Sequence, residues 1–271
     1  MLLAIDVGNT NTVLGLYELT NQTGAATSEM AANWRITTPS TKQTSDEFGV
    51  LLHNLFALRG LQVGLVDGIA ISSVVPSLDS MLRHVCELHF NVKPLFVEPG
   101  IKTGMPILID NPADLGADRL VNCIAAFERF GGPCIVVDMG TATTFDVVSK
   151  KGEFLGGAIA PGLGISAEAL FLRAARLPRI EIKKPEKVIG TGTIDNMQIG
   201  LYYGYIGLVD GILERMLAEM GTETKTVATG GLAALIAGGS KYIRAVDEML
   251  TLTGLRLIYE RNLDCSKKRE A

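Results

Sequence analysis

The chain opens on two short apolar runs separated by a polar loop. Leu2–Ile5 and Val13–Tyr17 are apolar and partly β-branched, a composition typical of buried strands. Between them, Asp6–Thr12 carries one carboxylate, one glycine and four amide or hydroxyl side chains. Asn-Thr-Asn is also ordinary turn chemistry. We expect a hairpin with a polar tip, in which Gly8 lets the backbone approach a bound group closely.

The same pattern occurs a second time in the chain. Cys134–Val148 aligns with the first hairpin without a gap at an offset of 132 residues, which places Asp138 on Asp6 and Thr144 on Thr12. Two strands that each end in Asp-x-Gly, one in each half of the chain, indicate an internal duplication. We therefore expect two similar loops that face each other.

The remaining periodicity predicts the order of elements in the first half. A polar segment, Leu19–Ala32, is expected to contain a turn. After it we expect a strand at Ala32–Thr37, a helix opening at Thr44–Phe48, a strand at Gly68–Pro76, a helix at Leu78–Phe90 and a strand at Lys93–Val97. A three-stranded meander followed by helix, strand, helix and strand is the ribonuclease-H-like arrangement.

The second half repeats this order after a connecting helix. The predicted elements are helices at Leu120–Arg129, Ser166–Arg176, Met197–Met220 and Met249–Arg261, and strands at Gly152–Ala160 and from Thr226 to a Gly-Gly turn at Gly230. We expect an α/β protein of two ribonuclease-H-like domains, each a mixed five-stranded sheet with helices. The predicted domains are 1–117 and 118–271, with the last helix packing back on the first domain.

Composition narrows the classes of partner. Apolar residues make up 47% of the 271 residues, charged residues 20%, and the net charge is −4, so nothing indicates a nucleic-acid binder. No apolar run reaches the length of a membrane span, which predicts a cytoplasmic protein. The four cysteines lack C-x-x-C spacing, which argues against a zinc site or a disulfide framework.

Other phosphate-binding and catalytic motifs fit poorly. The chain has no G-x-x-x-x-G-K-[ST] motif, which excludes a P-loop nucleotide site. Gly162-x-Gly164-x-x-Ala167 matches a loose dinucleotide pattern but lies midway through the second repeat, where a tight turn explains it. His53, His84 and His89 lie within apolar helical stretches and are expected to be packing or surface residues.

What remains is a set of carboxylates near glycine-rich loops, which suits phosphoryl transfer. That reaction needs positioning, a metal to offset phosphate charge, and a carboxylate to accept the hydroxyl proton. The candidates are Asp6, Asp118 and Asp138. Asp118 also fits a helix N-terminal residue or a surface ion pair with Arg119. Its small neighbours would nevertheless leave room for a substrate, and Arg119 could hold an anionic group beside the base.

Four motifs together resemble type III pantothenate kinases, a family of the acetate and sugar kinase, Hsp70 and actin superfamily. They cover most of the chain and are Asp6–Thr12, Asn111-Pro112-x-x-x-Gly116-Ala117-Asp118-Arg119, Asp138-x-Gly140-Thr141-Ala142-Thr143-Thr144 and Gly156-Gly157-Ala158-Ile159-x-Pro161-Gly162. The resemblance implies two actin-like ATPase domains. It also implies phosphorylation of pantothenate by ATP to 4'-phosphopantothenate, the first step of coenzyme A biosynthesis.

The resemblance also implies roles for individual residues. Asp118 matches the proton acceptor, and Asp138 matches the ligand of a monovalent cation, K⁺ or NH₄⁺. Thr193 matches a substrate contact delivered across a homodimer interface, of which the Met197–Met220 helix would form part. The implied ATP contacts are Asp6, Val7, Gly8, Asn9, Thr10, Asn11, Thr12, Val13 and Thr141, with Asp6 also helping to place Mg²⁺. The implied pantothenate contacts are Gly116, Ala117, Asp118, Arg119 and Thr193.

One position departs from the family pattern. Several relatives carry a tyrosine seven residues before the glycine of Gly-Ala-Asp-Arg, and this chain has Ile109. The difference bears on the pantothenate pocket and leaves the reaction unchanged. Two alternatives stay open from the residues: a kinase of another hydroxylated acid or sugar, and a nucleotide-binding regulatory protein of the same fold without catalysis.

Overall fold

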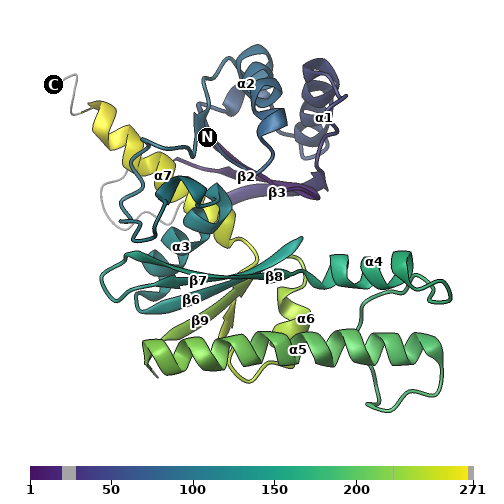
Figure 1. Cartoon of the computed structure of the whole chain (residues 1–271). Coiled ribbons are helices and arrows are strands. Elements are labelled where there is room, and N and C mark those ends of the chain that lie inside the picture. Colours follow the sequence, from purple (N-terminus) through teal and green to yellow (C-terminus); the bar gives the residue numbers. More distant parts are fainter. Residues whose placement is uncertain (20–28, 222, 268–271) are drawn as a thin grey trace. The chain divides into compact units, whose positions relative to one another are not determined.

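The computed structural model describes residues 1–19, 29–221 and 223–267 (Figure 1). Most of the polar segment in which we expected a turn, Leu19–Ala32, lies outside these residues. Contacts divide the chain into two compact units: Met1–Gly104, Ala113–Ala125 and Thr251–Ala271 form unit 1, and Met105–Pro112 and Ala126–Leu250 form unit 2. This division cuts the chain at other places than the expected boundary after residue 117, because the start of the helix Ala117–Phe130 groups by its contacts with unit 1.

Unit 1 is built on a five-stranded sheet. Its spatial order is β3-β2-β1-β4-β5, with β1, β2 and β3 antiparallel neighbours and β4 parallel to β1. The strands are β1 (Leu2–Val7), β2 (Asn11–Tyr17), β3 (Met30–Thr37), β4 (Gly68–Ser73) and β5 (Leu95–Phe96). The meander and the following crossovers confirm the predicted ribonuclease-H-like order.

One face of this sheet is covered by α1 (Ser45–Ala57) and α2 (Pro76–Phe90), as Figure 1 shows. Leu3, Ile5 and Val7 alternate along β1 and pack in one buried cluster with apolar side chains of both helices, as the two-residue period of a strand requires. This cluster also contains Leu14, Leu16, Phe48, Leu52, Phe56, Leu78, Leu82 and Val85.

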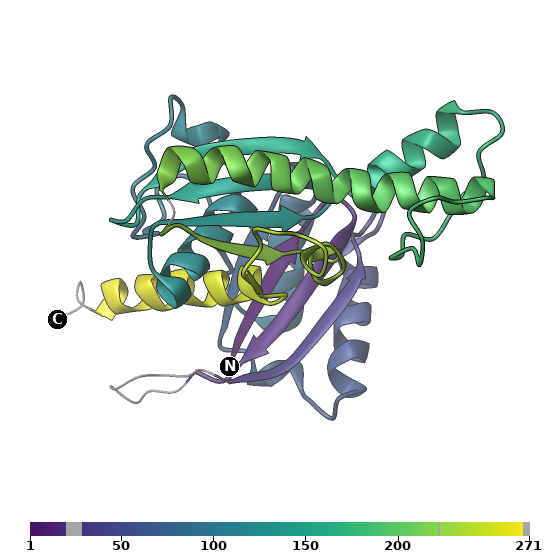
Figure 2. The ribbon, with the colours of Figure 1, turned by 90° about the horizontal axis from the view of Figure 1, so that it is seen from below.

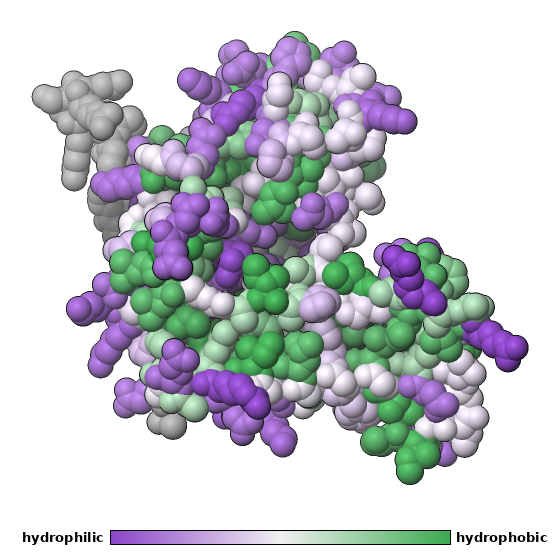
Figure 3. Space-filling model, viewed as in Figure 1, coloured by the Kyte–Doolittle hydropathy of each residue, from purple (hydrophilic) through white to green (hydrophobic). Residues whose placement is uncertain are grey.

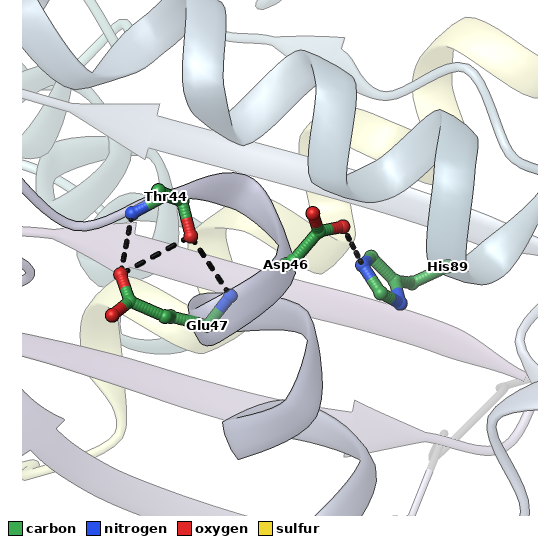
Figure 4. Close-up of polar contacts among 4 residues, drawn as sticks. All are labelled: Thr44, Asp46, Glu47 and His89. Atoms are coloured by element: carbon green, nitrogen blue, oxygen red, sulfur yellow. Dashed lines mark hydrogen bonds and ion pairs between the residues drawn. The ribbon is translucent and has the colours of Figure 1, made fainter.

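Polar contacts cap the start of α1 and also join α1 to α2 (Figure 4). Thr44 caps α1 with a capping box, in which its hydroxyl accepts from the Glu47 N–H at 3.2 Å and its own N–H donates to Glu47 Oε2 at 2.8 Å. His89 of α2 points toward Asp46 of α1, with Nε2 3.8 Å from Oδ1. His89 is thus a packing residue of the α1–α2 contact, as its apolar surroundings predicted.

The opposite face of the sheet contacts α7 (Leu250–Lys267) through small residues. A Cβ added at Gly15 would lie 2.9 Å from Leu252, and one at Gly68 would overlap the Tyr259 ring. At the crossing of α7 with α3 (Ala117–Phe130), a Cβ on Gly254 would lie 2.2 Å from the Val121 carbonyl oxygen. Glycine at these positions therefore lets α7 lie directly on both the sheet and α3.

Unit 2 repeats the sheet of unit 1. Its order is β10-β9-β6-β7-β8, with β6, β7 and β8 antiparallel neighbours and β9 parallel to β6. The strands are β6 (Cys134–Met139), β7 (Ala142–Val148), β8 (Phe154–Pro161), β9 (Lys225–Thr229) and β10 (Ala245–Val246), and the helices are α4 (Leu163–Arg173), α5 (Thr193–Met220) and α6 (Ala233–Ala237). Figure 2 shows α5 running along the sheet and beyond its end.

The registers of the two sheets confirm the duplication and correct its alignment. Asp6 pairs with Val13 and Val7 with Thr12, whereas Asp138 pairs with Thr144 and Met139 with Thr143. The second tip is therefore one residue shorter, and the equivalent of Thr12 is Thr143. The gapless alignment, which placed Thr144 on Thr12, was wrong because two threonines adjoin at this point.

Several predicted helices begin earlier than expected. The helix expected from Met197 begins at Thr193, that expected from Ser166 begins at Leu163, and that expected from Leu120 begins at Ala117. The first two follow Gly192 and Gly162, which make no side-chain cap hydrogen bond, so the sequence lacked the usual N-terminal signal.

Within the described residues, no helix is both long and apolar enough to cross a membrane.

We predict that Gly254→Ala destabilises the fold. Alanine adds up to about 1 kcal/mol of helix propensity, but its Cβ would lie 2.2 Å from the Val121 carbonyl and force α3 and α7 apart, at a cost of about 1–3 kcal/mol. Thermal unfolding should show a midpoint lower by about 2–6 °C.

A matched control is Gly64→Ala, because Gly64 lies in the 3-10 turn η1 (Val63–Leu65) with open space around its Cα. There alanine should leave stability unchanged or raise it by about 0.4–1 kcal/mol. Equal melting temperatures for the Gly254→Ala variant and the wild type would contradict the close crossing of α3 and α7.

Candidate active site

The first hairpin tip joins β1 to β2 in unit 1. Asp6 lies in β1, one residue before its end, and Asn9 and Thr10 are exposed at the tip. The Gly8 N–H donates to the Asn11 carbonyl at 3.0 Å, which closes a four-residue turn. A Cβ on Gly8 would lie 3.0 Å from the same oxygen, so only glycine fits without a shift.

Thr38, the residue after β3, holds this tip from the side. Its N–H donates to the Thr10 carbonyl at 3.0 Å and its hydroxyl donates to the Gly8 carbonyl at 2.5 Å. The Thr12 hydroxyl lies 3.2 Å from the Thr38 hydroxyl and is fully buried. Because Thr38 gives its proton to Gly8, Thr12 must donate to Thr38. Thr12 therefore supports the tip from within the protein.

The second tip, in unit 2, is held by other elements. Thr143 is fully buried and its hydroxyl bonds to the Tyr205 hydroxyl of α5. The Gly162 N–H donates to the Thr141 carbonyl at 3.1 Å. Burial raises the pKa of Tyr205, so its phenol keeps its proton at neutral pH.

Asp138 lies beside the Gly230-Gly231 turn that follows β9. A Cβ on Gly230, which has φ +96°, would lie 2.7 Å from Asp138 Oδ1 and 2.7 Å from the Met139 carbonyl oxygen. Any side chain at Gly230 would therefore crowd both oxygens. The structure thus brings Asp138 together with the Gly-Gly turn singled out in the sequence.

Asp118 is the second residue of α3, in the same contact unit as the first tip. The Arg119 N–H donates to Asp118 Oδ1 at 2.8 Å. A Cβ on Gly116 would lie 2.7 Å from the same oxygen, so glycine at 116 makes room for the carboxylate. Gly116 and Arg119 together fix the orientation of this acid.

Burial raises the pKa of Asp118 above its ordinary value of 3.8, and the Arg119 N–H and charge offset part of that rise. An acid that binds its proton more tightly in the folded chain makes stability fall as pH rises from 3.8 through the raised folded pKa. Ionised Asp118 therefore costs folding stability at neutral pH. Such a cost, placed beside small residues, is typical of a functional group.

Thr193 begins α5 and is exposed in the described chain. Beside the start of this helix lies a surface cavity of about 450 Å³, lined by Lys183, Lys184, Pro185, Glu186, Lys187, Ile189, Gly190, Thr191, Asp195, Gln198 and Ile199. None of the three candidate aspartates lines it.

Two buried hydroxyls next to the aspartates escaped the sequence analysis. Ser72 on β4 is in register with Asp6, and Thr229 on β9 is in register with Asp138. Both are buried, and Ser72 Oγ has no hydrogen-bond partner within the part of the chain described. An Asp beside a buried hydroxyl at the end of each first strand is thus a further shared feature of the two sheets. In the sequence, the only sign of this feature was that a serine on β4 and a threonine on β9 occupy equivalent positions.

Comparison with known structures shows the fold. The activator of the 2-hydroxyisocaproyl-CoA dehydratase from Clostridium difficile, solved with bound ADPNP, superposes with a TM-score of 0.56. The match covers 99% of this chain and 97% of that one at 11% identity. At this identity the likeness concerns the fold alone: two mixed five-stranded sheets with helices.

Comparison of sequences is more specific. A type III pantothenate kinase of Koribacter versatilis is 62% identical over 100% of this chain and 99% of its own length, and one of Acidobacterium capsulatum is 61% identical over 96% and 94%. The family model described as type III pantothenate kinase matches residues 2–215. With its two hairpin tips and the Gly-Ala-Asp-Arg segment, the chain belongs to the type III pantothenate kinase family.

Proposed function

We propose that the protein transfers the γ-phosphoryl group of ATP to the primary hydroxyl of pantothenate, giving 4'-phosphopantothenate for coenzyme A biosynthesis. The observation that carries this proposal is Asp118, a desolvated carboxylate held by the Arg119 N–H against Gly116. Membership of the kinase family supplies the reaction class.

Asp118 would accept the proton of the attacking hydroxyl. A carboxylate with a raised pKa binds a proton more tightly than an ordinary one, so it is a better acceptor as the hydroxyl oxygen bonds to phosphorus. The transition state of phosphoryl transfer is loose, so positioning contributes more than base strength. The Arg119 N–H and Gly116 provide that positioning.

Gly116, Ala117 and Arg119 would form the acceptor side of the site. Small residues at 116 and 117 leave room for pantothenate beside Asp118, and the Arg119 guanidinium would pair with its carboxylate. Ile109 replaces the tyrosine of several relatives and contacts Gly156, whose added Cβ would lie 3.6 Å away. The aliphatic side chain of Ile109 has no donor or acceptor, so it cannot form a hydrogen bond with a substrate.

The first tip would hold the phosphates of ATP. Asp6 lies at the end of β1, and a divalent metal bound to nucleotide commonly takes one or two carboxylates and completes its shell with phosphate oxygens and water. The tip from Asp6 to Val13 fits this pattern because it provides one carboxylate and a backbone held close by Gly8. Bound Mg²⁺ would offset charge on the transferred phosphoryl group.

Asp138 would hold a monovalent cation, K⁺ or NH₄⁺, and Thr141 would contact ATP. The described residues near Asp138 present oxygen ligands, its own Oδ1 and the Met139 carbonyl, both within 2.7 Å of a Cβ position that Gly230 leaves empty. Carboxylate and carbonyl oxygens are the ligands that hard cations prefer. The donor set therefore fits such an ion.

A homodimer is proposed on the basis of an apolar surface in unit 2. Ile189 is 85% exposed, Leu172 65%, Val188 64% and Ile194 52%. They lie at the end of α4, in the loop before α5 and at its start, and Figure 3 shows apolar residues gathered over the α4–α5 end. Patches of this kind commonly mark protein interfaces. Thr193 would reach the partner's substrate from this surface.

We predict that the Asp118→Asn variant loses turnover but keeps its fold. Because the general base is removed, kcat with pantothenate should fall by about 10²-fold or more, measured as ADP release. At neutral pH the variant should be at least as stable as wild type, and this advantage should shrink as pH falls through the raised pKa of Asp118 toward 3.8. Wild-type turnover in this variant would refute the role of Asp118.

The substrate is tested in the same assay with a panel of hydroxylated acids and sugars. ADP release with pantothenate and not with the others is the expected result. ATP binding without phosphorylation of any acceptor would instead favour a regulatory protein.

We predict that turnover needs a monovalent cation and that Asp138→Asn removes this dependence. Replacing K⁺ by Na⁺ should lower wild-type kcat/KM by about 10-fold, which corresponds to the loss of about 1.4 kcal/mol of charge stabilisation. The Asp138→Asn variant should show the low rate in both salts. Equal activation by K⁺ in variant and wild type would place the cation elsewhere.

We predict that the wild type has twice the chain mass of 28.9 kDa in sedimentation equilibrium. Ile189→Asp should weaken the dimer by about 10-fold or more, because a charge would be buried at the interface. It should also raise the KM for pantothenate. Leu58→Asp, at an 83% exposed site in unit 1, is the control and should change neither. A monomeric wild type would contradict the proposed interface.

A further inference from the structure

Thr38 makes three hydrogen bonds with residues of the first hairpin. Through its N–H and hydroxyl it bonds two tip carbonyls, those of Thr10 at 3.0 Å and Gly8 at 2.5 Å. The hydroxyl in turn accepts from buried Thr12, 3.2 Å away. Each group that Thr38 bonds belongs to the segment proposed to hold the ATP phosphates.

The geometry of the peptide unit gives these bonds a consequence for anion binding. The Gly8–Asn9 and Thr10–Asn11 bonds are trans, and in a planar trans peptide the C=O and N–H point in opposite directions. When Thr38 holds the carbonyls of Gly8 and Thr10 toward itself, the N–H groups of Asn9 and Asn11 point away from it. Carbonyl oxygens repel phosphate, whereas backbone N–H groups that point out on one side of a turn attract it.

We propose that Thr38 is a positioning residue for nucleotide phosphate. It turns the carbonyls of the first tip inward and thereby presents the Asn9 and Asn11 N–H groups to the phosphate chain. This role rests on the proposed function of the first tip. It adds Thr38, the residue after β3, to the residues that shape the proposed nucleotide site. Thr38 itself does not touch the reacting atoms.

The second tip provides an internal comparison. There the equivalent of Thr12, Thr143, bonds to the hydroxyl of Tyr205 on α5. Both tips thus have a buried threonine at the same register position, tied to a second hydroxyl. Among the residues that the structure describes, that second hydroxyl also holds a tip carbonyl, that of Gly8, in the first tip only.

The test compares Thr38→Val with Thr38→Ser. Valine keeps the shape of threonine and the backbone N–H but cannot bond the Gly8 carbonyl, so the Kd for Mg·ADP measured by calorimetry should rise by about 3- to 10-fold. The KM for Mg·ATP should rise equally, and the KM for pantothenate should stay within about 2-fold. Serine restores the hydroxyl and should bring both nucleotide constants back to within about 2-fold of wild type.

Two further variants separate positioning from stability. Thr38→Ala removes the hydroxyl without a larger side chain and should weaken nucleotide binding as valine does. Thr41→Val alters an exposed threonine three residues on, outside the first tip, and should leave binding unchanged. Thermal melts establish that every variant is folded at the assay temperature.

Three results would overturn the proposal. Wild-type affinity in Thr38→Val would show that the hydroxyl does not position the tip. Weak binding by Thr38→Ser equal to that of Thr38→Val would assign the effect to the methyl group and its packing. If the wild type does not bind Mg·ADP, the proposed nucleotide site itself is wrong. This outcome differs from the first two because wild type and variants would then all fail to bind.

Discussion

A buried threonine hydroxyl at the base of each hairpin tip is the contact on which the proposed site depends. A loop that receives phosphate must turn its carbonyl oxygens away from the anion, and those oxygens then need donors inside the protein. In the first tip, Thr38 and Thr12 supply and support these donors. In the second, Thr143 is tied to Tyr205. The exposed part of each tip keeps its shape because a rigid sheet and its buried hydroxyls hold the ends.

The duplication explains why the two tips are alike, and the differences between the two copies explain how the roles of the tips could diverge. Both sheets have the same strand order, and both aspartates lie beside a buried hydroxyl of the next parallel strand. The second tip is one residue shorter and lies against the turn at Gly230. A longer tip offers more backbone N–H groups to a phosphate chain, and a shorter one beside carbonyl oxygens suits a cation. The two proposed roles follow this difference.

Much of this arrangement was predictable from sequence, because strands and helices leave periodic patterns and a duplication leaves a repeat. The strands at Leu2–Ile5 and Val13–Tyr17 and the Gly-Gly turn after β9 are confirmed. The register of the second hairpin was not predictable, because Thr143 and Thr144 are chemically identical and a one-residue gap leaves no mark. Thr38 was missed because its role depends on backbone carbonyls, which no side-chain motif reports. Thr193 was predicted to precede its helix because Gly192 provides no capping side chain.

The position of Asp118 relative to the first tip is set by packing within unit 1. Helix α7 lies on β2 at Gly15 and on α3 at Gly254, and the Thr251 hydroxyl donates to Asn122 Oδ1 at 2.7 Å. The strand that follows the first tip and the helix that carries Asp118 are therefore both held by one element. A Cβ at Gly15 or Gly254 would displace α7 from the sheet or from α3. This displacement would shift Asp118 without any direct contact with it. Asp118 costs stability where it lies, and close glycine contacts keep it there. Gly116 and the Arg119 N–H therefore hold a desolvated carboxylate in place at a cost to the stability of the fold, as is typical of a functional group.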